Sequence, residues 1–154
     1  TFFVGGVWAS KNEELLNKIL EGGHELGNHG YNHKDHDKIS EEKNKQEIYQ
    51  THEIVTALTG VEMNLFAPPS GAYNQTTLDI AKTYGYQTIM WTKDTIDWRD
   101  KDAKVIYDRA VDNPQNGDLI LMHPTACTLE VFGDIIDFYL DKEFSVVTVS
   151  ENIS

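Results

Sequence analysis

Two histidines lie four residues apart in a polar segment of the sequence, NHGYNH at residues 28–33. One helical or tight-turn winding brings both imidazoles to the same side of the chain. Neutral imidazole is a common zinc ligand, and two imidazoles with one carboxylate leave the fourth position of a tetrahedral ion open to water. The spacing favours a hydrolytic metal site at His29 and His33, and a surface or capping role for both side chains is the alternative.

A third histidine, His123, follows the apolar run at residues 119–122. A lone histidine in such a place is often structural, but the end of a buried strand is also where a pocket would lie. The segment at residues 90–98 contains Asp94, Asp97 and Trp98, so it offers carboxylates that can orient an imidazole and an indole that can stack on a sugar. Helix capping and a plainly exposed ring are the competing interpretations.

The segment FAPPSGAYN at residues 66–74 predicts a stiff loop. Two consecutive prolines fix φ, and Gly71 permits a sharp bend. Such a loop suits the wall of a binding site, although a simple strand-to-helix connector is compatible with the same residues.

The remaining candidates for chemistry are interpreted as structural. Asp35 and Asp37 are expected to be loop or capping residues, and Cys127, the single cysteine, is expected to be a small apolar side chain. The same holds for the other histidines, which are His24, His36 and His52.

Apolar segments rich in aromatic and β-branched residues alternate with longer helical patterns, which is typical of parallel strands linked by crossover helices. Strands are predicted at residues 1–4, 24–28, 64–67, 87–91, 119–122 and 145–149, and helices at 12–21, 40–60, 76–84, 103–111 and 129–140. Ligand sites of parallel sheets lie beyond the carboxyl ends of the strands. The histidines, the proline loop and the aspartates all follow predicted strands.

The composition fits one domain spanning residues 1–154, with 40% hydrophobic residues and a formal net charge of -12. This charge repels phosphate backbones and anionic lipid, so nucleic acid is not an expected partner and a neutral or locally shielded substrate is favoured. No apolar run approaches the roughly 20 residues of a membrane span. The strand pattern at residues 1–4 indicates a polypeptide that continues upstream, where any export signal would lie.

In this order, the segments resemble four of the five motifs of the NodB-type polysaccharide deacetylases, carbohydrate esterase family 4. The similarity extends from residues 1–4 to residues 144–151 and is particularly close in GHELGNH at 23–29, while the APPSG loop resembles the sporulation-associated subgroup. The resemblance implies an α/β fold, a distorted and incomplete (β/α) barrel. It also implies a hydrolase that removes N-acetyl groups from N-acetylglucosamine-type polysaccharide, either peptidoglycan or a chitin-like polymer, outside the cell or at its wall.

The resemblance also implies roles for individual residues. His29 and His33 would bind zinc or another divalent transition metal, and His123 would be the general acid that protonates the departing amine. Asp97, or failing that Asp94, would hold His123 in its charged form. The substrate-binding positions would be Pro69, Gly71, Tyr73, Trp98 and Leu121.

Two departures from the family pattern qualify this assignment. The opening motif, with its paired aspartates, is absent from residues 1–154, so we expect an N-terminally incomplete domain lacking the first strand and helix, with an upstream segment supplying both strand and aspartate ligand. The arginine of the third motif, which orients the catalytic base, falls on Ala67. Ala67 favours the alternative of a degenerate domain that binds cell-wall glycan without turnover.

Overall fold

The computed structural model describes residues 1–154, which form two compact units, an N-terminal unit at Thr1–Met90 and a C-terminal unit at Trp91–Ser154. Every pair of neighbouring strands is parallel, and helices connect successive strands within each sheet. The predicted α/β class is therefore confirmed. A single domain over residues 1–154 stays a prediction.

The N-terminal unit is built on a four-stranded sheet of order β1-β2-β3-β4. The strands are short: β1 is Phe2–Val4, β2 is Leu26–Asn28, β3 is Leu65–Phe66 and β4 is Gln87–Thr88. Asn28 lies opposite both Val4 and Phe66. This register brings the residues that follow β2 and β3 next to each other at the carboxyl end of the sheet.

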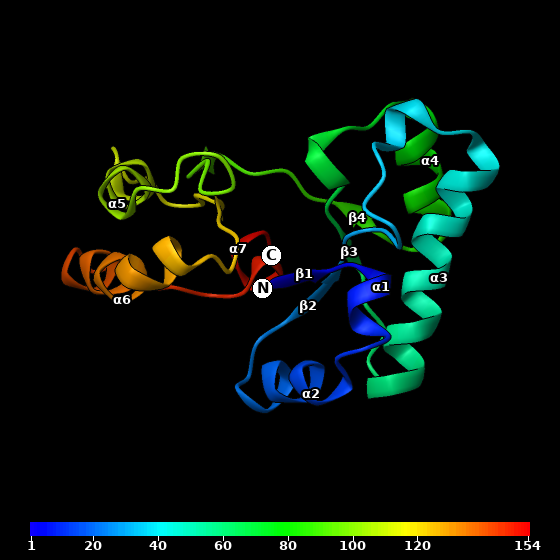
Figure 1. Cartoon of the computed structure of the whole chain (residues 1–154), viewed down its shortest axis with the longest axis horizontal. Helices are drawn as coiled ribbons and strands as arrows, with labels where there is room; N and C mark the ends of the chain where they lie inside the picture. Colours follow the sequence, from blue (N-terminus) through cyan, green and yellow to red (C-terminus); the bar gives the residue numbers. More distant parts are fainter. The chain divides into compact units, whose positions relative to one another are not determined.

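Helices pack around this sheet, with α3 in contact with α1, α2 and α4 (Figure 1). Helix α3 begins after Ser40, whose hydroxyl accepts a hydrogen bond from the Lys43 amide, and ends at Gly60, which has the left-handed φ of 73° that glycine adopts easily. The bounds are Gly6–Ala9 for α1, Glu13–Glu21 for α2, Glu41–Thr59 for α3 and Gln75–Thr83 for α4, with short 3-10 turns at His36–Lys38 and Pro69–Gly71.

The core of the N-terminal unit lies between these helices and the sheet. Leu16 of α2, Ile48 and Val55 of α3 and Phe66 of β3 are fully buried and belong to one apolar cluster. Burial of each such side chain contributes about 1.5–3 kcal/mol. This cluster fixes α3 against the strands that carry the candidate site.

The C-terminal unit contains a two-stranded sheet and the helices α5 and α6, which lie side by side (Figure 1). Strands β5 (Lys93–Asp94) and β6 (Ile120–Leu121) pair so that Asp94 lies opposite Leu121. Helices α5 (Ala103–Val111) and α6 (Ala126–Asp141) share a core that includes Ala110, Ile135 and Tyr139. The Tyr139 hydroxyl donates a 2.8 Å hydrogen bond to the carbonyl of Ala110, which satisfies a polar group inside this core.

The strand predicted at residues 145–149 is wrong, because this segment belongs to neither sheet. Its β-branched residues favour a strand, but Thr148 and Glu151 form a capping box that starts the short helix α7 (Val149–Asn152). The strand predicted at residues 87–91 ends at Thr88, and the chain forms β5 instead a few residues later. None of the helices combines the length and the apolar character needed to cross a lipid bilayer.

Candidate functional site

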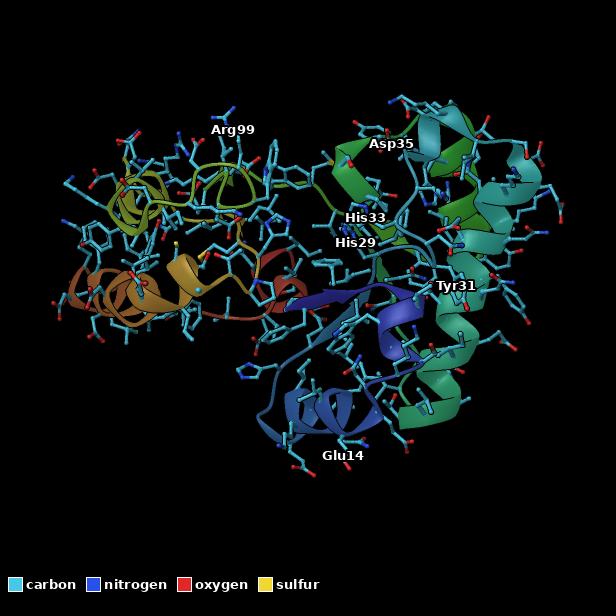
Figure 2. All side chains as sticks on the ribbon, viewed as in Figure 1. Glu14, His29, Tyr31, His33, Asp35 and Arg99 are labelled. Atoms are coloured by element: carbon cyan, nitrogen blue, oxygen red, sulfur yellow. The ribbon has the colours of Figure 1, made fainter.

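The turn that follows β2 brings His29 and His33 together. Their ring centroids are 5.0 Å apart and the ring planes are inclined at 72°. Figure 2 shows the two labelled side chains next to each other. The turn is tight because Gly30 and His33 both have left-handed φ values, of 72° and 56°. His29 is half-buried and His33 is exposed, so both imidazoles sit at the rim of the N-terminal unit.

The backbone of the third strand orients His29. Because Asn28 pairs with Phe66, the next residues in the two chain segments are neighbours, and Nδ1 of His29 lies 2.7 Å from the carbonyl oxygen of Ala67. A carbonyl only accepts hydrogen bonds, so Nδ1 carries the hydrogen and Nε2 carries the lone pair. Metal-binding histidines are usually held in this way through the nitrogen that does not bind the metal.

This geometry fits a pair of metal ligands. Two imidazoles would supply two of the four positions around a tetrahedral zinc ion. The structure has no group of three or more His, Cys, Asp or Glu side chains placed to hold a metal ion. The roles of His29 and His33 as metal ligands therefore stay a prediction. In this prediction the chain supplies two of the side chains that bind the metal ion.

Asn28 secures the start of the turn. Its side chain is fully buried, accepts a 2.9 Å hydrogen bond from the Gly30 amide and donates one of 2.9 Å to the carbonyl of Ile48. Asn28 thus joins the histidine turn to α3. Sequence reasoning missed this role, although an asparagine at the last position of a buried strand was a signal for it.

The proline loop packs against the same turn. Cγ of Pro69 is 3.4 Å from the point that a Cβ atom on Gly30 would occupy. Ser70 has a left-handed φ of 57°, Gly71 has one of 64°, and the Tyr73 ring is 43% exposed. The loop presents Tyr73 to solvent, and its stiffness stays a prediction.

Asp35 connects the histidine segment to this loop. The pKa of its carboxyl group is held below the usual range, first by hydrogen bonding to Lys38 and then by hydrogen bonding to Ser70. Nδ2 of Asn74 donates a long 3.5 Å hydrogen bond to the carbonyl of Asp37. These contacts agree with the interpretation of Asp35 and Asp37 as loop residues.

In the C-terminal unit, Asp97 is the carboxylate that contacts His123. Nδ1 of His123 lies 2.7 Å from Oδ1 of Asp97, and Oδ2 accepts hydrogen bonds of 2.6 Å from the His123 amide and 2.7 Å from the Thr128 hydroxyl. The Asp97 side chain is fully buried while that of His123 is 40% exposed. Burial raises the pKa of Asp97, but the hydrogen bonds from His123 and Thr128 outweigh it and lower the pKa overall.

Asp94 has a different function in the structure. Its Oδ1 accepts a 2.8 Å hydrogen bond from the amide of Ile96, a residue with a left-handed φ of 54°. Asp94 therefore stabilises the turn between β5 and Asp97. Leu121 is half-buried in β6, and the Trp98 ring is 59% exposed with the Arg99 guanidinium 5.9 Å from its centroid.

Thr128 carries no distinguishing signal of its own in the sequence. Helix α6 begins at Ala126, earlier than the predicted residue 129, because the Thr125 side chain accepts a hydrogen bond from the Thr128 amide. This earlier start places Thr128 in the first turn, where its hydroxyl reaches Asp97. The threonine that follows Pro124 was the available signal for this cap.

Comparison with known sequences identifies the family of this chain. Residues 1–89 match the model of the polysaccharide deacetylase family. A peptidoglycan-N-acetylglucosamine deacetylase of Bacillus cereus is 32% identical over 98% of this chain and 73% of its own length. The uncharacterized protein YlxY of Bacillus subtilis is 40% identical over 98% of this chain, which spans 47% of YlxY.

Solved structures give the same result. The CE4 family pseudoenzyme BA3943 from Bacillus anthracis has a TM-score of 0.95 at 31% identity, covering 99% of this chain and 54% of that protein. The peptidoglycan deacetylase PdaC from Bacillus subtilis has a TM-score of 0.90 at 28% identity, covering 98% of this chain and 74% of the other. The expected fold is confirmed, and the chain belongs to the polysaccharide deacetylase family, carbohydrate esterase family 4.

Proposed function

We propose that this chain is the deacetylase domain of a metal-dependent hydrolase that removes N-acetyl groups from an N-acetylglucosamine-type polysaccharide at the cell wall. The observation that carries the proposal is the paired imidazoles of His29 and His33, with His29 oriented by the Ala67 carbonyl. Peptidoglycan is the first candidate substrate because a relative from Bacillus cereus is named a peptidoglycan-N-acetylglucosamine deacetylase. A chitin-like polymer has the same acetamide group.

In this proposal His29 and His33 hold zinc or another divalent transition metal, with a carboxylate and a solvent oxygen completing the coordination. A metal bound there would polarise the acetamide carbonyl and lower the pKa of its bound water. By resemblance to the family, the base that would take a proton from this water is an aspartate of the opening motif, which residues 1–154 do not contain. The remaining roles are proposed for side chains and backbone groups of this chain.

Once the oxygen of a water molecule has bonded to the acetyl carbon, His123 is proposed to protonate the amine as the amide C–N bond breaks, so that the sugar keeps a free amine and the acetyl group leaves as acetate. Asp97 holds the ring by its Nδ1 and stabilises positive charge on the imidazole. Thr128 and the His123 amide hold Asp97 in turn. The buried carboxylate is thus fixed from three directions and keeps His123 in one orientation.

The proline loop is proposed to hold the substrate. The amides of Gly71 and Ala72 donate hydrogen bonds to the carbonyls of Pro68 and Pro69, whereas the Tyr73 amide donates none within the chain. The Tyr73 amide is thus available to stabilise the negative oxygen of the tetrahedral intermediate.

The remaining proposed substrate contacts are exposed or half-buried side chains. The exposed rings of Tyr73 and Trp98 offer apolar faces for sugar rings, and Leu121 with Trp98 is proposed to border the acetyl group. Pro69 and Gly71 would form the rigid wall of the site.

A second function is favoured by two observations. Ala67 stands where the family carries an arginine, and the chain is similar to BA3943, which is named a pseudoenzyme and for which a mutant with restored enzymatic activity is also known. The second candidate is therefore a domain that binds cell-wall glycan without turning it over. Acetate release separates the two functions, because only the first produces it.

The test is acetate release from N-acetylated peptidoglycan and from chitin oligomers in the presence of zinc. We expect His123→Ala to lower the rate by about 10²- to 10⁴-fold, the usual contribution of a general acid, while leaving zinc affinity unchanged. His24→Ala, at an exposed position, is the matched control. An unchanged rate in His123→Ala excludes the acid role, and glycan binding by the wild type without acetate supports the second function.

A further inference from the structure

A buried carboxylate lies beneath the histidine turn. Glu47 is in the first half of α3 and only 6% of its surface is exposed. Its Oε2 accepts hydrogen bonds of 2.8 Å from the Tyr31 amide and 2.6 Å from the Asn32 amide, and Oε1 accepts one of 2.8 Å from Nδ2 of Asn32. Both oxygens of Glu47 are therefore directed at the two residues just before His33.

The burial of this charge depends on the turn. Glu47 forms no ion pair with a lysine or an arginine, so the N–H groups of Tyr31 and Asn32 are its main compensation for lost hydration. Hydrogen bonds to an ionised acceptor are roughly twice as strong as neutral ones, and a buried charge without them is strongly destabilised. The contact therefore restrains the turn more firmly than an ordinary loop contact would.

The turn needs such a restraint. His33 has a left-handed φ of 56°, a conformation that costs a non-glycine residue on the order of 1 kcal/mol and persists only when its surroundings impose it. On the other side of Tyr31–Asn32, Gly30 is enclosed as well: a Cβ atom there would lie 3.2 Å from Nε2 of His36 and 3.3 Å from Oε2 of Glu47. Glu47 therefore lies close to all three residues between the two histidines, which are Gly30, Tyr31 and Asn32.

Other neighbours do not duplicate this contact. The Tyr31 ring packs against α1, since its Cδ2 lies close to the point that a Cβ atom on Gly6 would occupy. In Figure 2 Tyr31 is labelled apart from the two imidazoles. The His29 ring is held by Ala67, but no hydrogen bond of this kind holds the His33 ring. The position of His33 relative to His29 therefore follows from the backbone at Tyr31 and Asn32, which Glu47 fixes.

We propose that Glu47 is a positioning residue that sets the metal affinity of the His29–His33 pair by fixing the turn between them. The inference rests on the proposed function, because it concerns the same metal site. Removing a group that orients metal ligands typically lowers metal affinity about 10- to 100-fold. That is the loss we expect for Glu47→Ala, with a smaller loss for Glu47→Gln, whose side-chain oxygen still accepts from the turn.

The experiment titrates zinc alone into the 154-residue chain and measures amide hydrogen exchange of the metal-free protein at Tyr31 and Asn32. Glu47→Ala should lose 10- to 100-fold in zinc affinity and the protection of both amides, and Glu47→Gln should lose about 3- to 10-fold. Glu53→Ala, an exposed acidic position on the same helix, should stay within twofold of the wild type. All affinities are measured well below the melting temperature of each variant.

The outcomes separate the two proposals. A wild type that takes up no zinc overturns the proposed metal site and this inference together. Zinc binding by the wild type with equal affinity in a folded Glu47→Ala overturns the role of Glu47 alone, since a residue that only stabilises the fold would lower the melting temperature and spare the affinity. If Glu47→Ala does not fold, Glu47→Gln decides the question, because an unchanged affinity and unchanged amide protection in that variant reject the proposal.

Discussion

The N-terminal and C-terminal units each orient a histidine through its Nδ1 atom, but with different acceptors. In the N-terminal unit the acceptor for His29 is the backbone carbonyl of Ala67, and in the C-terminal unit the acceptor for His123 is the carboxylate of Asp97, each at 2.7 Å. A carbonyl fixes the neutral ring with its lone pair on the opposite nitrogen, which suits a metal ligand. A carboxylate in addition stabilises positive charge, which suits a proton donor.

The ring nitrogens of His36 have a third kind of surroundings. Its ring is fully buried, its Nδ1 lies 2.6 Å from Oδ1 of Asn44, and its Nε2 has no hydrogen-bond partner. Burial lowers the pKa of His36, which opposes protonation. A histidine side chain is therefore suited to metal binding, to proton transfer or to packing, and the groups around its two ring nitrogens decide which.

The largest effect is expected from removing the imidazoles of the N-terminal unit. The double variant His29→Ala with His33→Ala should lower zinc affinity by about 1000-fold or more, because it deletes both of the proposed side-chain ligands. Calorimetric titration with zinc measures this, and a double variant of His24 and His52 provides a control with the same number of histidines removed. If the variant lacking His29 and His33 still binds zinc, the proposed contrast between a metal-binding histidine in the N-terminal unit and a proton-donating histidine in the C-terminal unit is wrong.

The next effect distinguishes the two aspartates of the C-terminal unit. Asp97→Asn should lower acetate release by about 100-fold or more, because an amide cannot stabilise charge on His123 and can favour the wrong tautomer. Asp94→Asn should change the rate less than about fivefold, since asparagine still accepts from the Ile96 amide. Rates on one substrate at one zinc concentration provide the measurement, and equal losses in the two variants would contradict the assignment of Asp97.

The smallest effect concerns His36 and the pH dependence of stability. Since the pKa of His36 is lowered in the folded protein, the unfolded chain binds more protons as pH falls below about 6.5, and the free energy of unfolding decreases there. Between pH 7.5 and 5.5 we expect a loss of roughly 1 kcal/mol that His36→Gln does not show. Urea denaturation at the two pH values measures it, with His24→Gln as the control; an identical pH dependence in His36→Gln would argue against this role.

The fold was largely predictable where local signals and tertiary packing agree. Helix α3 matches the predicted range because Ser40 and Gly60 define its ends chemically. The strand predicted at residues 145–149 failed because its β-branched residues compete with the capping box of Thr148 and Glu151. A strand also needs a hydrogen-bonding neighbour, and no local pattern specifies one.

The candidate site was predictable only in part, for a similar reason. His29 and His33 are recognisable from their spacing, and Asp97 and His123 from their positions near strand ends. Glu47 could not be distinguished from an ordinary solvent-facing helical glutamate, because its partners are backbone groups 15 and 16 residues earlier in the chain. Sequence patterns reveal the groups suited to chemistry more readily than the groups that hold them.

The hydrogen bond from His29 to Ala67 uses a main-chain oxygen, so it does not depend on which side chain residue 67 carries. The side chain at position 67 can therefore change without loss of the hydrogen bond that orients the His29 imidazole. If the proposed site holds a metal ion, a substitution at residue 67 would change the surroundings of that site and leave the orientation of the His29 ligand unchanged.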